Sequence, residues 1–202
     1  MNWISAIFFI ARVRHRNSRL GQALPLCRAD FSDDICHKIW VFMKTMTRSI
    51  LFVCLGNICR SPAADAIMRA KAAAAGLDVD VDSAGIGAWH AGQLPDIRMR
   101  RCGDKHGYDM RHRARQVTAE DFDRFDIVMG MDAQNASDLR ALAATDRQKA
   151  KVRLMADYLT RHPGQRSIPD PYYGDEGDFE LAVELIEDAV ENIVRLMKED
   201  KI

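Results

Sequence analysis

The sequence has no excess of charge of either sign, and it is poor in long apolar segments. Lys and Arg total 29 and so do Asp and Glu, so the chain lacks the general positive field that attracts nucleic acid. The apolar stretch at residues 3–11 is much shorter than the roughly 20 residues that a spanning helix needs. The arginines near this stretch come after it, whereas a signal peptide has its positive charges before the apolar stretch. We therefore expect no nucleic-acid partner and no stable membrane anchor.

Cysteine is also scarce, and its number is odd. The five cysteines of this mid-sized chain are more typical of reduced thiols than of a disulfide framework, which predicts a cytoplasmic protein. No grouping of Cys and His has a spacing typical of metal ligands. We expect no metal site and no cofactor.

Charge is distributed unevenly along the chain. Residues 1–45 carry seven Lys or Arg against three Asp or Glu. We interpret this segment as an extension outside the fold, or as sequence upstream of a start at Met46. The alternative is a membrane-surface or regulatory role, but residues 3–20 show no convincing amphipathic pattern. The expected domain is therefore 46–202.

Within 46–202, apolar patterns of strand and helix type alternate. The expected strands span 48–54, 79–83, 126–129 and 151–155, and the expected helices span 61–75, 96–106, 119–124, 133–144 and 178–199. Alternating β and α units form parallel sheets with helices on both faces. The predicted fold class is α/β, a four-stranded parallel sheet in a flavodoxin-like or Rossmann-like three-layer sandwich.

The segment ILFVCLGNICRSP, residues 50–62, combines a buried strand, a cysteine, a short loop and a helix start. Helix N-termini favour anions, and they also lower the pKa of a nearby thiol. Arg60 offers bidentate donors to a phosphoryl group, and Ser61 can donate to the sulfur of Cys54. Gly56 and Asn57 tolerate the positive φ of a tight loop. The pattern predicts a nucleophilic thiolate in an oxyanion site.

A phosphoryl-transferring thiolate also needs a general acid for the leaving oxygen. Asp170 lies between two prolines in the segment PDPYYG, which stiffen its loop and can fix its carboxylate. By itself this segment could be an ordinary acidic turn. Beside Cys54 and Arg60, it predicts the general acid.

The segments VCLGNICRSP and DPYYGDEGDF together resemble the low-molecular-weight protein tyrosine phosphatase family, over residues 47–199. The resemblance implies that Cys54 forms a phosphocysteine, that Arg60 binds phosphate, and that Asp170 acts as acid and then as base. It also implies a phosphate-binding loop and a network that supports it. The loop residues are Leu55, Gly56, Asn57, Ile58, Cys59 and Ser61, and the supporting residues are Ser83 and His112. Asp132 is interpreted as structural.

The resemblance also implies a substrate class. Trp89 and Tyr172 match aromatic positions that could enclose a phenyl ring, and the alternative for Trp89 is ordinary loop packing. Ile58 stands where relatives resembling protein-arginine phosphatases carry threonine, which favours phosphotyrosine. Cys59 could form a protective disulfide with Cys54 or could be an ordinary buried cysteine.

We therefore expect a metal-independent protein-tyrosine phosphatase that acts on phosphotyrosine proteins, with a tyrosine kinase as a further partner left open. One alternative is a phosphatase of phosphoarginine or of small aryl phosphates. Another is an arsenate reductase, which the lack of further cysteines after Cys102 disfavours. A phosphate-binding module without turnover would not be expected to retain Cys54, Arg60 and Asp170.

Overall fold

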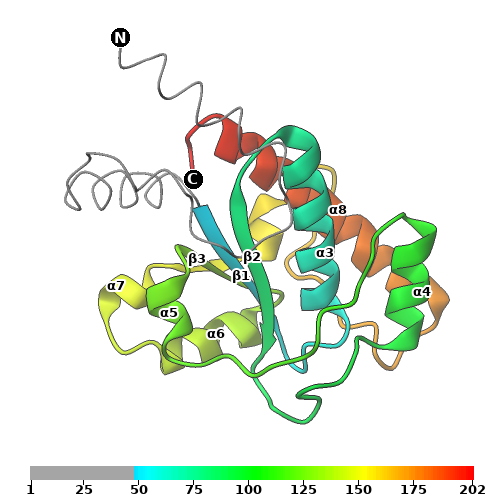
Figure 1. The fold of residues 1–202 in the computed structure, drawn as a ribbon, viewed down its shortest axis with the longest axis horizontal. Helices are drawn as coiled ribbons and strands as arrows, with labels where there is room; N and C mark the ends of the chain where they lie inside the picture. The colour runs from blue at the N-terminus through cyan, green and yellow to red at the C-terminus, as the bar shows by residue number, and fades with distance from the viewer. Residues whose placement is uncertain (1–47) are drawn as a thin grey trace, which may run out of the picture. The chain divides into compact units, whose positions relative to one another are not determined.

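A computed structural model describes residues 48–202, so the expectations for residues 1–45 lie outside the described part. Its centre is a four-stranded parallel sheet in the order β2-β1-β3-β4 (Figure 1). The strands are β1 (Arg48–Cys54), β2 (Val79–Gly85), β3 (Ile127–Gly130) and β4 (Val152–Leu154). The predicted parallel sheet with its α/β order is confirmed.

β1 lies in the middle of the sheet and is buried on both faces. Alternate side chains of a strand point to opposite faces. Accordingly, Ile50 and Phe52 pack in one apolar cluster, and Leu51 and Val53 pack in the other. This double burial explains why the sequence of β1 is a continuous apolar run without alternation.

Helices cover both faces of the sheet (Figure 1). The first cluster joins β1 to α3 (Arg60–Ala75), α4 (Ile97–Lys105) and α8 (Glu176–Lys198), and the second joins it to α5 (Asp121–Arg124) and α6 (Ala133–Leu142). The short α7 (Asp146–Lys149) and the 3-10 helix η2 (Met155–Tyr158) complete the described elements. None of these helices combines the length and apolarity that a bilayer crossing requires.

Several helix boundaries differ from the prediction because of capping. α8 begins earlier than expected, since Asp175 is its N-cap and forms a reciprocal capping box with Asp178. Thr145 and Gln148 form a second capping box, which starts the unpredicted α7. α5 is shorter than expected because the chain before it forms tighter i→i+3 turns, in which the Asp121 N–H donates to the Thr118 carbonyl and the Phe122 N–H donates to the Ala119 carbonyl.

The order of the strands fixes where a ligand can bind. The chain passes from β1 to β2 on one side and then crosses to β3 on the other, so the connections diverge at the carboxyl ends of β1 and β3. Ligands of open α/β sheets bind at such a switch point. Cys54 is the last residue of β1 and therefore lies there.

Candidate active site

The loop from Cys54 to Ser61 joins the carboxyl end of β1 to the amino end of α3. Asn57 has a φ of +56°, so it takes the left-handed conformation that the tight loop requires, and Gly56 does not. Cys59 is the N-cap of α3 and makes no side-chain cap hydrogen bond. The first N–H groups of a helix have no helical acceptor, so this uncapped end can bind an anion.

Polar hydrogens surround the sulfur of Cys54. The sulfur lies 3.1 Å from Ser61 Oγ and accepts the Asn57 N–H at 3.3 Å. The side chain of Cys54 is 3% exposed. A thiolate at this place would accept hydrogen bonds from its own loop, which is the environment of a sulfur nucleophile.

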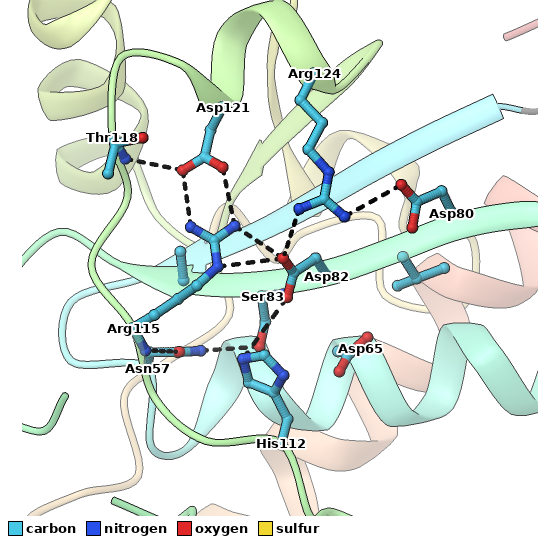
Figure 2. A network of polar contacts seen from close by, with 12 residues as sticks. Asn57, Asp65, Asp80, Asp82, Ser83, His112, Arg115, Thr118, Asp121 and Arg124 are labelled. Carbon is cyan, nitrogen blue, oxygen red and sulfur yellow. Dashed lines mark hydrogen bonds and ion pairs between the residues drawn. The ribbon is translucent and has the colours of Figure 1, made fainter. Parts of the chain in front are cut away.

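Asn57 is buried at the centre of a hydrogen-bond network that holds the loop (Figure 2). Its Nδ2 donates to Ser61 Oγ and to Ser83 Oγ, each at 2.9 Å. Its Oδ1 accepts the backbone N–H of Arg115 at 2.9 Å. The amide therefore uses both of its donors and its acceptor, and this fixes the Ser61 hydroxyl next to Cys54.

The guanidinium of Arg115 fixes the segment that bonds Asn57. It binds both oxygens of Asp121, at 2.9 and 3.0 Å, and Oδ2 of Asp82 at 2.9 Å (Figure 2). Asp82 belongs to β2 and precedes Ser83. The ion pairs therefore tie the chain around Arg115 to the strand that carries one partner of Asn57.

Arg60 carries the site's positive charge and is 3% exposed. Its Nη1 donates to Asp132 Oδ2 at 2.7 Å, and its Nη2 donates to Asp170 Oδ2 at 2.5 Å. Burial alone would lower the pKa of Arg60, but Cys54, Asp170 and Asp132 hold that pKa above its usual value. Its Nε has no hydrogen-bond partner among the described residues, so it can donate to an oxyanion.

Asp170 comes to the site from the loop before α8. Its Oδ1 accepts the Tyr172 N–H at 3.2 Å, and its carboxyl group is 41% exposed. The loop is also held by Ile168, whose carbonyl accepts from Arg60 at 3.1 Å. A carboxyl group placed next to Arg60 and open to solvent can reach a bound phosphate ester and water.

The two expected aromatic walls lie on separate loops. Tyr172 is 37% exposed, and the guanidinium of Arg98 lies 5.5 Å from its ring centroid. Trp89 is 68% exposed, and its ring covers Gly87, where a Cβ would lie 1.9 Å from a ring carbon. The Gly87 N–H donates to the Leu55 carbonyl at 2.9 Å, which ties this loop to the Cys54–Ser61 loop.

The remaining predicted residues differ in their burial and in whether they join the hydrogen-bond network. Leu55 is exposed on the loop, Ile58 and Cys59 are buried, and Ser83 joins the network. Burial, together with Cys54, raises the pKa of Cys59, which keeps it a neutral thiol. His112 lies outside the hydrogen-bond chain, because its Nε2 lies 3.7 Å from Asp82 and lacks a hydrogen-bond partner within residues 48–202.

Two functional contacts were not predicted from the sequence. Asp132 was interpreted as structural, and it does cap α6, yet its other oxygen also binds Arg60. Its place directly after β3 was the available signal, because that strand ends at the same sheet edge as β1. Arg115 gave no local signal, since its partners lie in β2, α5 and the Cys54–Ser61 loop.

Comparisons of the sequence and of the structure with known proteins all point to one family. The family model described as low molecular weight phosphotyrosine protein phosphatase matches residues 49–202. A low molecular weight protein-tyrosine-phosphatase of Streptomyces coelicolor is 43% identical over 157 residues, covering 76% of this chain and 96% of that protein. The human low molecular weight phosphotyrosine protein phosphatase is 44% identical, covering 66% and 85%. The structure of an Entamoeba histolytica protein tyrosine phosphatase superposes with a TM-score of 0.74 at 39% identity, covering 77% and 100%.

Proposed function

The chain belongs to the low molecular weight phosphotyrosine protein phosphatase family, and we propose that Cys54, Arg60 and Asp170 are its catalytic residues. The family consists of cysteine-dependent protein-tyrosine phosphatases. The observation that carries the assignment is the convergence of the three side chains. Arg60 is hydrogen-bonded to Asp170 and begins the helix whose amino end faces the sulfur of Cys54.

In the first step, the Cys54 thiolate attacks phosphorus. An S–P bond forms while the P–O bond to the leaving group breaks, and Asp170 donates its proton to the leaving oxygen. Arg60 and the N–H groups of the loop stabilise the charge on the phosphoryl oxygens. The products of this step are an alcohol or phenol and a phosphocysteine.

In the second step, water attacks the phosphocysteine and Asp170, now a carboxylate, accepts its proton. The S–P bond breaks, inorganic phosphate forms, and the thiolate is regenerated. Ser61 stabilises that thiolate, because its hydroxyl lies 3.1 Å from the sulfur. Since Asp170 is partly exposed, water can reach the position that this step needs.

The substrate class follows from the residues around the loop. Trp89 and Tyr172 would line the route of a phenyl ring to Cys54, and the buried Ile58 makes the loop apolar beside it. We assign phosphotyrosine in proteins as the substrate. Phosphoarginine and small aryl phosphates are the second candidates, and an Ile58→Thr variant should gain phosphoarginine hydrolysis relative to phosphotyrosine hydrolysis if Ile58 selects between them.

We also propose the bounds of the catalytic domain, the location of the enzyme and its partners. The region matched by relatives begins near residue 49, which supports a catalytic domain of 46–202 with residues 1–45 outside it. We place the activity in the cytoplasm, where phosphotyrosine proteins and a tyrosine kinase are the expected partners. A chain starting at Met46 should keep the kcat/KM of the full chain, and a marked loss would assign residues 1–45 a role in the domain.

The decisive experiment follows phenol release from aryl phosphates of different leaving-group pKa. Cys54→Ser should have no measurable turnover. Asp170→Asn should lose about 10²- to 10⁴-fold with poor leaving groups and much less with good ones. Asp138→Asn, at a half-buried carboxylate on α6 that accepts from Gln134 Nε2, is the control and should match the parent chain. Turnover by Cys54→Ser, or an Asp170→Asn loss that is independent of the leaving group, would contradict the assignment.

A further inference from the structure

A second group of reactive side chains lies between α4 and α8, away from Cys54. Cys102 and His106 are one helical turn apart at the end of α4, and Glu180 faces them from α8. Their three ligand atoms, a sulfur, a ring nitrogen and a carboxylate oxygen, lie within 4.8 Å of one another. His106 Nε2 is 2.8 Å from Glu180 Oε2.

The second ring nitrogen of this histidine also faces a carboxylate. Its other ring nitrogen, Nδ1, lies 3.7 Å from Glu187 Oε2. Glu187 is itself held by the Tyr108 hydroxyl, which donates to Oε1 at 2.6 Å. Metal-bound histidines usually donate a hydrogen bond from their second ring nitrogen to a carboxylate, and Glu187 lies just beyond that distance.

A simple ion pair explains only part of this arrangement. Lys105 also binds Glu180, at 3.3 Å through Oε1, so the carboxylate already has cationic partners. A helix pair held by such contacts does not need a buried thiol next to the carboxylate. Cys102 is 3% exposed, while the side chains of His106 and Glu180 are 29% and 36% exposed, so the group lies where the buried core meets solvent.

We propose that Cys102, His106 and Glu180 bind one Zn²⁺ ion, which links α4 to α8. Sulfur, nitrogen and oxygen ligands on a divalent ion of borderline softness are the combination that zinc accepts. Three protein ligands leave the fourth tetrahedral position to water. Lys105 keeps Oε1 of Glu180. The ion takes Glu180 Oε2 and His106 Nε2 in place of the contact between these two atoms, so the proton of the neutral imidazole lies on Nδ1.

Proton release accompanies this binding. Burial, together with Glu180, raises the pKa of the Cys102 thiol to about 12. The ion therefore replaces the thiol proton, which goes to solvent, and the imidazole binds in its neutral form. This group has no recognisable sequence pattern, because Glu180 lies 74 residues beyond His106 and only the fold brings it close.

One of the two helices that carry the site also contacts the loop of Asp170. Arg98, in the first turn of α4, lies 4.7 Å from the Phe179 ring and 5.5 Å from the Tyr172 ring. Tyr172 belongs to the loop that carries Asp170. An ion bound between the helices thus also stabilises the packing of α4 against this loop, and it stabilises the folded chain by mass action.

The test uses Co²⁺, which replaces Zn²⁺ in such sites and absorbs light when bound to thiolate. The full-length chain should carry Cys54→Ser and Cys59→Ser, so that thiols of the catalytic loop cannot bind the probe and the result does not depend on the proposed function. We expect one Co²⁺ per chain, a thiolate-to-cobalt absorption band, and a higher Tm with Co²⁺ or Zn²⁺.

The band should be absent from a further Cys102→Ser variant and strongly reduced in His106→Asn and Glu180→Gln. Glu187→Gln should weaken Co²⁺ binding about 10- to 100-fold, because it removes the carboxylate that orients His106. Glu184→Gln, on the exposed side of α8, is the matched control and should bind as the parent does.

Glu180→Gln keeps the size of the side chain, so it tests the site even if Cys102→Ser fails to fold. The absence of a thiolate band from the parent, or a band that survives both Cys102→Ser and Glu180→Gln, would overturn the proposal.

Discussion

Arg60 joins two carboxylates from distant parts of the chain: its Nη2 lies 2.5 Å from Asp170 Oδ2, and its Nη1 lies 2.7 Å from Asp132 Oδ2. Substrate binding should affect the two contacts differently. In the proposed mechanism, a phosphoryl group in the loop would compete with Asp170 for the guanidinium, and the carboxyl group would then be free to serve the leaving oxygen. Asp132 lies at the start of α6 and can keep its contact throughout. We infer that Asp132 positions Arg60.

Asp132→Asn tests this positioning role. Asparagine is as good an N-cap as aspartate, so the unfolding free energy should change by less than about 1 kcal/mol. The weaker contact to Nη1 should lower kcat/KM for an aryl phosphate about 10-fold, or about 1.4 kcal/mol of transition-state stabilisation. Steady-state kinetics and urea unfolding provide the measurements. A variant that loses stability but retains kcat/KM would show that Asp132 is only a helix cap.

Asn57 combines a strained backbone with a fully used side chain, and two substitutions separate these contributions. Asn57→Gly and Asn57→Ala both lose the hydrogen bonds to Ser61, Ser83 and Arg115. A positive φ strains alanine but not glycine. The Asn57→Ala variant should therefore be about 1 kcal/mol less stable than the Asn57→Gly variant in urea unfolding. Both should lose most of their phosphatase activity. Equal stabilities would mean that the loop relaxes out of the left-handed conformation.

Local sequence signals sufficed for the framework of the fold and for the place of Cys54 at the end of β1. β1 is a continuous apolar run because both of its faces are buried, and that run ends at Cys54. Gly76 closes α3 in the left-handed conformation, as its position after an alanine-rich segment predicts. In these cases the residues that determine the structure are neighbours in the chain, so a pattern of a few residues is enough.

Contacts between distant segments escaped prediction for the opposite reason. Arg115 binds Asp82, 33 residues earlier, and its N–H binds Asn57, 58 residues earlier. An arginine in a polar loop has no feature that distinguishes it from a solvated one until the fold places carboxylates around it. The same holds for His106 and Glu180. Long-range polar partners depend on how the elements pack, which no local pattern encodes.

Gly87→Ala tests whether Trp89 contacts the aryl group of the substrate. The new Cβ would lie 1.9 Å from the present position of the Trp89 ring, so this exposed ring must move. Stability should change by less than about 1 kcal/mol, because the ring can move into solvent. KM for aryl phosphates should rise several-fold while kcat changes little. Gly164→Ala, where a Cβ meets nothing within 4 Å, is the control. An unchanged KM would assign Trp89 to loop packing.

Asp188 on α8 should make the stability of the fold depend on pH in the acid range. The residue is 1% exposed and accepts the Thr160 N–H, the Thr160 hydroxyl and the Arg161 N–H, at 2.9, 2.6 and 2.9 Å. Burial alone would raise the pKa of Asp188, but these hydrogen bonds outweigh it, with that of the Thr160 side chain the largest, and lower the pKa. The folded chain therefore favours the ionised carboxylate.

A lowered folded pKa means that this stabilisation is complete above the unfolded pKa of about 3.9 and is lost as the pH falls through the folded pKa. Asp188→Asn should therefore be about 1–3 kcal/mol less stable than the parent in urea at pH 7, and the difference should shrink below about pH 4. Asp146→Asn, at a fully exposed carboxylate on α7, should show no such difference. If the Asp188→Asn deficit stayed constant down to pH 3, the missing stability would come from packing and not from the buried charge.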